Sequence, residues 1–168
     1  ETGIEPAIKP AALQTKTDAI GILATKGTLS SKLFHKTTNL FGNGINIIEQ
    51  EGEGIVQLIE TGKLYSDEMK GLLNIYLKPM IEANIDHLVL GCTHYPYLMP
   101  ILLEILPKHV KIIDSGEAVA KQTKAILEKH QLLNTQHTKS THQFFTNGSP
   151  KVMTELLDGN YNVEYLEF

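Results

Sequence analysis

The chain has 168 residues, 42% of them hydrophobic, and a net charge of −4 at neutral pH. That apolar content is enough for a sizeable core, and a negative charge with no basic stripe argues against a nucleic-acid-binding surface. The single cysteine excludes an internal disulfide framework and fits a reducing compartment, and no apolar run is long enough for a transmembrane helix.

Strands and helices are predicted to alternate along the chain. In order, the predicted elements are a helix over 8–14, a strand over 18–25, a helix from Thr28 or Ser30 to Phe41, a strand over 45–49, a helix over 55–61, a long helix from the Ser66 cap to Asn84, a strand over 88–90, a helix over 96–106, a strand over 110–113, a helix over 117–130, a strand over 143–146, a helix over 150–157 and a strand over 161–166. This alternation predicts an α/β fold with a mostly parallel sheet flanked by helices. Leu29, Leu33, Leu40 and Phe41 are predicted to form the buried side of the helix that ends at Phe41, and 134–141 is predicted to be a surface loop.

The stretch around Cys92 carries the strongest chemical signal. A lone cysteine is more often a small buried hydrophobic residue than a catalyst. Cys92, however, directly follows the predicted strand and Gly91, and Thr93 and His94 come next. A thiol at the carboxyl end of a parallel strand, just before a helix, lies where open α/β sheets bind ligands. His94 is near enough to tune the thiol or to hold a carboxylate.

Other polar residues have both a functional and a structural interpretation. Thr25 and Thr28 lie where a strand passes into a helix, so they either bind an anion or simply cap the helix, and spacing alone favours the cap. Glu60 is predicted to be an ordinary surface glutamate, and Asp114 an ordinary helix cap.

The metal hypothesis is weak, and no phosphate loop or serine nucleophile elbow is present. Six of the histidines show no ligand spacing beyond the isolated pair His137 and His142; they are His35, His87, His109, His130, His137 and His142.

A family resemblance emerges from these residues. The hexapeptide Gly91-Cys92-Thr93-His94-Tyr95-Pro96 resembles the second cysteine motif of the glutamate racemases, a branch of the aspartate/glutamate racemase family. Three further segments agree in order and spacing: Ile20–Thr28 resembles the family's strand and threonine turn, Leu58–Gly62 the segment with its auxiliary glutamate, and Asp114–Gly116 the return into its first lobe.

The resemblance implies a cytoplasmic bacterial racemase that needs no cofactor and no metal and supplies D-glutamate for peptidoglycan and cell shape. Cys92 would be one of two cysteines that exchange the α-proton, with His94 and Glu60 as its acid/base helpers. Thr93, His94, Thr25 and Thr28 would bind the substrate, glutamate. No nucleic-acid or membrane partner is implied, and a homodimer is left open.

The sequence also departs from the family pattern. The family's earlier Asp-Ser-Gly and Cys-Asn-Thr motifs are absent, and Gly52-Glu53 replaces a Cys-Pro pair. Because Ile4-Glu5-Pro6 also looks like a strand exit with no strand before it, we expect a truncated chain. Residues 8–113 would form the complete second lobe, with 1–7 and 114–168 as part of the first lobe. With one cysteine, the chain alone is predicted to be inactive.

Three alternatives remain open at this stage. A related racemase acting on aspartate or a hydantoin would share the fold and the cysteine. A cysteine-nucleophile hydrolase would need a base oriented by a third group. A non-catalytic module that binds a small anion would tolerate replacement of Cys92.

Overall fold

The computed structural model describes residues 5–134 and 141–168, apart from the side chains of residues 5 and 6. Ile4, most of the predicted loop 134–141 and His137 therefore lie outside the described residues. Within the described part of the chain, no helix combines the length and the apolar composition needed to cross a bilayer.

The observed elements follow the predicted order. The strands are β1 (Ala19–Ala24), β2 (Asn46–Glu51), β3 (His87–Gly91), β4 (Lys111–Ile113), β5 (Phe144–Thr146) and β6 (Val163–Tyr165). The helices are α1 (Glu5–Gln14), α2 (Lys26–Leu29), α3 (Lys32–Phe41), α4 (Ile55–Glu60), α5 (Asp67–Glu82), the 3₁₀ helix η1 (Tyr95–Leu98), α6 (Met99–Ile105), α7 (Gly116–Lys129) and α8 (Pro150–Leu156).

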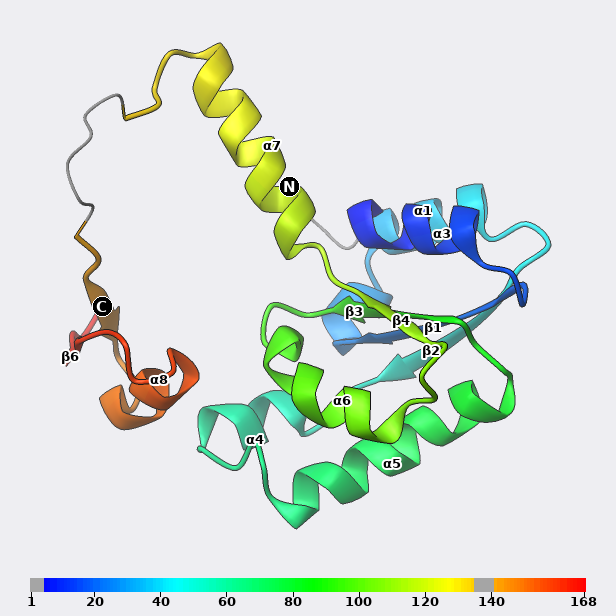
Figure 1. Cartoon of the computed structure of the whole chain (residues 1–168), viewed down its shortest axis with the longest axis horizontal. Helices are drawn as coiled ribbons and strands as arrows, with labels where there is room; N and C mark the ends of the chain where they lie inside the picture. The colour runs from blue at the N-terminus through cyan, green and yellow to red at the C-terminus, as the bar shows by residue number, and fades with distance from the viewer. Residues whose placement is uncertain (1–4, 135–140) are drawn as a thin grey trace.

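Four strands form a parallel sheet in the order β2-β1-β3-β4. All six residues of β1 are buried because this strand lies in the middle of the sheet with helices on both faces. The predicted α/β fold with a parallel sheet is confirmed. In Figure 1, α1 and α3 cover one face of the sheet, and α4, α5 and α6 cover the other.

The two cores follow from the alternation of side chains along each strand. Ile20 and Ile22 of β1 and Val89 of β3 pack with α1 and with Phe34 of α3. Leu23 of β1, with Leu88 and Leu90 of β3, packs with the buried faces of α4, α5, η1 and α6. A period of two along the strands thus divides their apolar residues between the two helical layers.

The segment between β1 and β2 differs from the prediction. A single helix from Thr28 or Ser30 to Phe41 is wrong, because α2 and α3 are separate helices capped by the hydroxyls of Thr25 and Ser31.

The predicted buried face of this segment is also partly wrong. Leu40 is 61% exposed, whereas Phe34 and Thr37 are buried. Thr37 can occupy a buried position because its hydroxyl donates to the Leu33 carbonyl, 2.9 Å away. Hydrophobicity alone predicted Leu40 on the buried face of this segment and not the polar Thr37.

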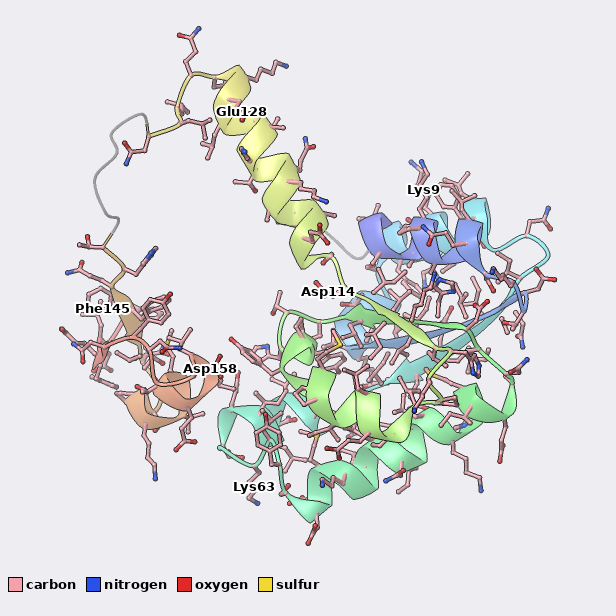
Figure 2. All side chains as sticks on the ribbon, viewed as in Figure 1. Lys9, Lys63, Asp114, Glu128, Phe145 and Asp158 are labelled. Carbon is pink, nitrogen blue, oxygen red and sulfur yellow. The ribbon has the colours of Figure 1, made fainter. Side chains whose placement is uncertain are left out.

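Residues after β4 form a second region with different packing. Helix α7 projects away from the sheet, and Glu128 near its far end stands well clear of the rest of the molecule (Figure 2). Strands β5 and β6 pair in parallel as a separate two-stranded sheet beside α8. No residue of 114–134 or 141–168 is buried.

Candidate active site

Cys92 lies at the carboxyl end of the central strand β3, as its sequence context predicts. It is half-buried, Thr93 is exposed, and His94 directly precedes η1. The Tyr95 N–H donates to the Cys92 carbonyl at 3.2 Å, which closes a tight turn at the cysteine. The thiol therefore lies at the edge of the parallel sheet where ligands bind in open α/β folds, and not in the middle of a core.

The structure brings Glu60, which is distant in the sequence, next to His94, two residues after Cys92. His94 Nε2 lies 3.1 Å from Glu60 Oε1, and His94 Nδ1 lies 4.0 Å from Cys92 Sγ. Because a carboxylate accepts hydrogen bonds, Nε2 carries the hydrogen that points at Glu60. Nδ1 is then free to accept the thiol proton, or, once protonated, to donate to a thiolate. The three side chains form a line for moving or holding one proton.

Glu60 has a specific partner that its local sequence does not indicate. It ends α4, and its side chain is 60% exposed, as expected of a surface glutamate. Its carboxylate nevertheless points to a specific partner 34 residues further along the chain. The contact arises because α4 and η1 both pack against the core that includes Leu90, a relation that local sequence does not contain.

Thr25 and Thr28 hold the end of the neighbouring strand against the cysteine strand. The Thr28 hydroxyl donates to the Gly91 carbonyl at 3.0 Å, and Thr25 Oγ1 accepts the Thr28 N–H at 3.3 Å. The two hydroxyl oxygens are 3.1 Å apart, so the Thr25 hydroxyl must donate to Thr28. Both hydroxyl hydrogens are used inside the protein, and the observed role of this turn is structural.

Tyr95 holds the cysteine motif against the core. Its hydroxyl donates to the Gly52 carbonyl at 3.2 Å, and the side chain is fully buried. Burial, followed by the neighbouring charges of Cys92, Tyr76 and Glu51, raises the pKa of Tyr95 far above its ordinary value, so the hydroxyl remains a donor. A Cβ at position 52 would collide with this hydroxyl, which explains why glycine stands here.

A cavity of about 630 Å³ opens beside His94. Glu60, Thr93 and His94 line one side of it, and residues 146–149 with α8 line the other. Residues 146–149 were not predicted to be near the site. The only sequence signal was the Asn147-Gly148 turn between a strand and a helix, which is too common to indicate function. Thr25, Thr28 and Cys92 are not lining residues of this cavity.

No group of three or more His, Cys, Asp or Glu side chains among the described residues is arranged to hold a metal ion. Asp114 was predicted to be a helix cap, but Ser115 is the N-cap residue of α7 and makes no side-chain cap bond. The Asp114 carboxylate instead accepts the Gly116 N–H at 2.6 Å, a local turn contact just before the helix.

Comparison with known proteins identifies the family of the chain. A family model described as Asp/Glu/Hydantoin racemase matches residues 2–123. Glutamate racemase of Pseudomonas putida strain F1 is 41% identical over 155 residues, which cover 92% of this chain and 58% of that protein. The glutamate racemase of Pseudomonas syringae pv. tomato is 43% identical over 139 residues, covering 83% of this chain and 50% of the relative.

Solved structures show the same fold. Glutamate racemase isoform RacE1 of Bacillus anthracis superposes with a TM-score of 0.78 at 27% identity, over 98% of this chain and 62% of that one. Escherichia coli glutamate racemase, solved with L-glutamate and the activator UDP-MurNAc-ala, gives 0.76 at 30% identity, over 95% of this chain and 61% of that one. The chain spans about three fifths of the P. putida relative. By its sequence and its fold, the chain belongs to the Asp/Glu/hydantoin racemase family.

Proposed function

We propose that this chain is part of a glutamate racemase and provides one of the two acid/base groups that invert the α-carbon. The observation that carries the proposal is the line Cys92–His94–Glu60 at the carboxyl end of β3. The relatives at 41–43% identity are glutamate racemases, which favours glutamate over other substrates of the family.

The chemistry of inversion assigns a task to each residue in this line. One group removes the α-proton from one face of the carbon, and a second group returns a proton to the other face. Cys92 as a thiolate takes the proton and becomes a thiol, and in the reverse direction the thiol gives it back. His94 holds or delivers the proton that the thiol exchanges, and Glu60 orients the imidazole and stabilises its charged form.

Substrate binding is assigned to the open side of the cavity. Thr93 is exposed and lines this cavity together with His94. Thr25 and Thr28 reach a substrate carboxylate only when their hydroxyls leave the bonds to Thr28 and Gly91. In the proposal they first fix the strand end beside Cys92 and bind substrate second.

Inversion also requires a group on the opposite face of the carbon, and Cys92 is the only cysteine among the 168 residues. We assign that group to the first lobe of the family's fold. Residues 8–113 form the second lobe in this proposal, and 1–7 with 114–168 form part of the first. The intact protein would act in the cytoplasm without a cofactor and supply D-glutamate for peptidoglycan.

The test compares the 168-residue chain with a chimera in which the remaining first-lobe segment of the P. putida relative precedes it. Each is incubated with L-glutamate in deuterated water, and D-glutamate is measured by chiral chromatography and mass spectrometry. The chain alone is expected to form no D-glutamate, because one base cannot serve both faces. The chimera is expected to form α-deuterated D-glutamate, and Cys92→Ala in it lowers the rate about 10³-fold.

Matched variants separate the roles of the three residues. Glu60→Gln lowers the rate about two- to fivefold, because an exposed ion pair contributes modestly, and it shifts the pH profile of the reaction. Glu68→Gln, an exposed glutamate on α5, leaves both unchanged. Sustained D-glutamate formation by the 168-residue chain, or full activity of the Cys92→Ala chimera, would disprove the proposal. Faster turnover of L-aspartate or a hydantoin would show that the protein belongs to another branch of the family with a different substrate.

A further inference from the structure

The carbonyl group of Gly52 connects the two segments that carry the proposed acid/base residues. Gly52 is buried and directly follows β2, and its carbonyl oxygen accepts two hydrogen bonds. One comes from the Tyr95 hydroxyl at 3.2 Å, and the other comes from the Ile55 N–H at 3.3 Å. Tyr95 is the first residue of η1, and Ile55 is the first residue of α4. A single buried carbonyl is therefore bonded to the start of both helices.

These two helices hold the proton line, which consists of Cys92, His94 and Glu60. His94 directly precedes η1, Glu60 ends α4, and the two side chains meet at 3.1 Å. Cys92 belongs to the same unit as η1, because its carbonyl accepts the Tyr95 N–H at 3.2 Å. Helix α4 has only six residues, so Glu60 lies about 9 Å along its axis from the bond at Ile55. A shift at the start of so short a helix displaces Glu60 as well.

The sheet fixes the position of the Gly52 carbonyl. The Gly52 N–H donates to the Ala24 carbonyl at 2.9 Å, at the carboxyl end of β1. Ala24 is in turn the register partner of Gly91, the residue before Cys92. The carbonyl that receives the Tyr95 hydroxyl is thus held at a fixed place relative to the strand that carries the thiol.

The Tyr95 hydroxyl and the absence of a side chain at position 52 are complementary. Tyr95 is 0% exposed and belongs to the same core as Ile55 and Ile59. A Cβ at Gly52 would collide first with the Tyr95 hydroxyl and then with the side chain of Ile55. A side chain at position 52 and a hydroxyl at position 95 therefore compete for the same space, so the two positions depend on each other.

We propose that Tyr95 is a positioning residue for the proton line and acts through the bond of its hydroxyl to Gly52. This inference rests on the proposed function, which gives the proton line its role. The bond holds η1 and α4 at one separation and so keeps His94 Nε2 within hydrogen-bond distance of Glu60. Tyr95 is not among the residues that line the cavity beside His94, so it acts through its neighbours and not on the substrate.

The test measures how fast iodoacetamide alkylates Cys92, the only cysteine, in the 168-residue chain. The rate at pH 9.5 reports access to the thiol, and the ratio of the rate at pH 7 to that rate reports its ionisation. Tyr95→Phe is expected to lower the ratio about three- to tenfold, because a displaced His94 no longer favours the thiolate. The variant keeps its fold, as circular dichroism would show, since the ring stays in the core and the Gly52 carbonyl keeps the Ile55 N–H.

The matched control is Tyr76→Phe. The Tyr76 hydroxyl donates to the carbonyl of Glu53, the next residue of the same loop, at 3.0 Å, but Tyr76 belongs to α5. Its replacement removes an equivalent bond without touching η1 and is expected to leave the ratio unchanged. Gly52→Ala is expected to lower the ratio, because the new Cβ displaces the Tyr95 hydroxyl. The double variant Gly52→Ala/Tyr95→Phe relieves that collision and is expected to lie closer to the parent than Gly52→Ala does.

The alkylation ratio needs no racemase activity, so it decides the role of Tyr95 separately from the proposed function. A chimera that forms no D-glutamate would count against the proposed function alone. In an active chimera, Tyr95→Phe is expected to lower kcat about fivefold and to leave KM nearly unchanged, because Tyr95 does not touch the substrate. An unchanged ratio in Tyr95→Phe, an equal fall in Tyr76→Phe, or additive losses from Gly52→Ala and Tyr95→Phe would overturn the proposal.

Discussion

The two regions of this chain bury very different shares of their apolar side chains. In residues 19–113, helices pack on both faces of one parallel sheet, and residues such as Leu23, Phe34 and Leu77 are 0% exposed. In 114–134 and 141–168 no residue is buried, although Ile126, Leu132 and Phe145 are large and apolar. Both regions have regular helices with capping residues. Local sequence is therefore sufficient to define helices, but long-range packing is needed to give them stability.

Hydrogen exchange tests this contrast most directly. Amides of β1 and β3 are expected to exchange at least about 10³-fold more slowly than those of α7, because opening the sheet breaks two cores and opening α7 breaks none. A helix of 14 residues with no buried side chain is marginal in water. Exchange measured by NMR or mass spectrometry that is equally slow in both regions of a monomer would contradict the comparison.

Two matched leucine truncations sharpen the comparison between the two regions. Leu77→Ala in α5 removes a fully buried side chain and is expected to lower the free energy of unfolding by about 3–4 kcal/mol. Leu127→Ala in α7 is expected to cost less than about 1 kcal/mol, since Leu127 is only partly buried. Urea denaturation of both variants measures the difference, and equal losses would mean that α7 packs as tightly as α5.

Two acidic residues extend the comparison to pH. Burial raises the pKa of Asp86, but four hydrogen bonds to its carboxylate outweigh burial and lower the pKa in the folded state. Its contribution is therefore fully present above the unfolded pKa of about 4 and is lost as pH falls below it. Asp86→Asn is expected to lower stability at pH 7 by about 2 kcal/mol and to flatten the loss of stability in acid. Glu117 on α7 also has a lowered pKa, from its contact with Lys121, but it is fully exposed. Glu117→Gln is therefore expected to leave the loss of stability in acid unchanged. Denaturation followed from pH 7 to pH 3 distinguishes the two, and parallel curves for wild type and Asp86→Asn would count against the assignment.

The smallest expected effects concern helix caps. The Ser66 hydroxyl accepts the Met69 N–H at 3.1 Å at the start of the longest helix, and Ser66→Ala is expected to cost about 1 kcal/mol. Ser149 makes the same contact with Val152 at 3.4 Å, at the start of a helix with no buried residue. Ser149→Ala is expected to change the global unfolding free energy by less, as thermal denaturation would show. A larger loss from Ser149→Ala would place α8 within the cooperative core.

Much of the fold and part of the site were predictable because they depend on local patterns. The parallel strands, the Ser66 cap and the position of Cys92 at the end of a strand follow from apolar runs, capping residues and the six-residue motif. The buried face of the segment after β1 differs from the prediction because Thr37, a polar residue, is buried with its hydroxyl bonded within α3. Hydrophobicity alone cannot anticipate such a position.

The sequence by itself thus determined the α/β class, the family resemblance and Cys92, since each depends on residues adjacent in the chain. Only the tertiary structure decided that Glu60 contacts His94, that the hydroxyl hydrogens of Thr25 and Thr28 are used within the protein, and that His87 Nε2 has no hydrogen-bond partner among the described residues. The Glu60–His94 and Thr28–Gly91 contacts join segments that are distant in the sequence, and they exist because the two cores pack strands and helices against one another.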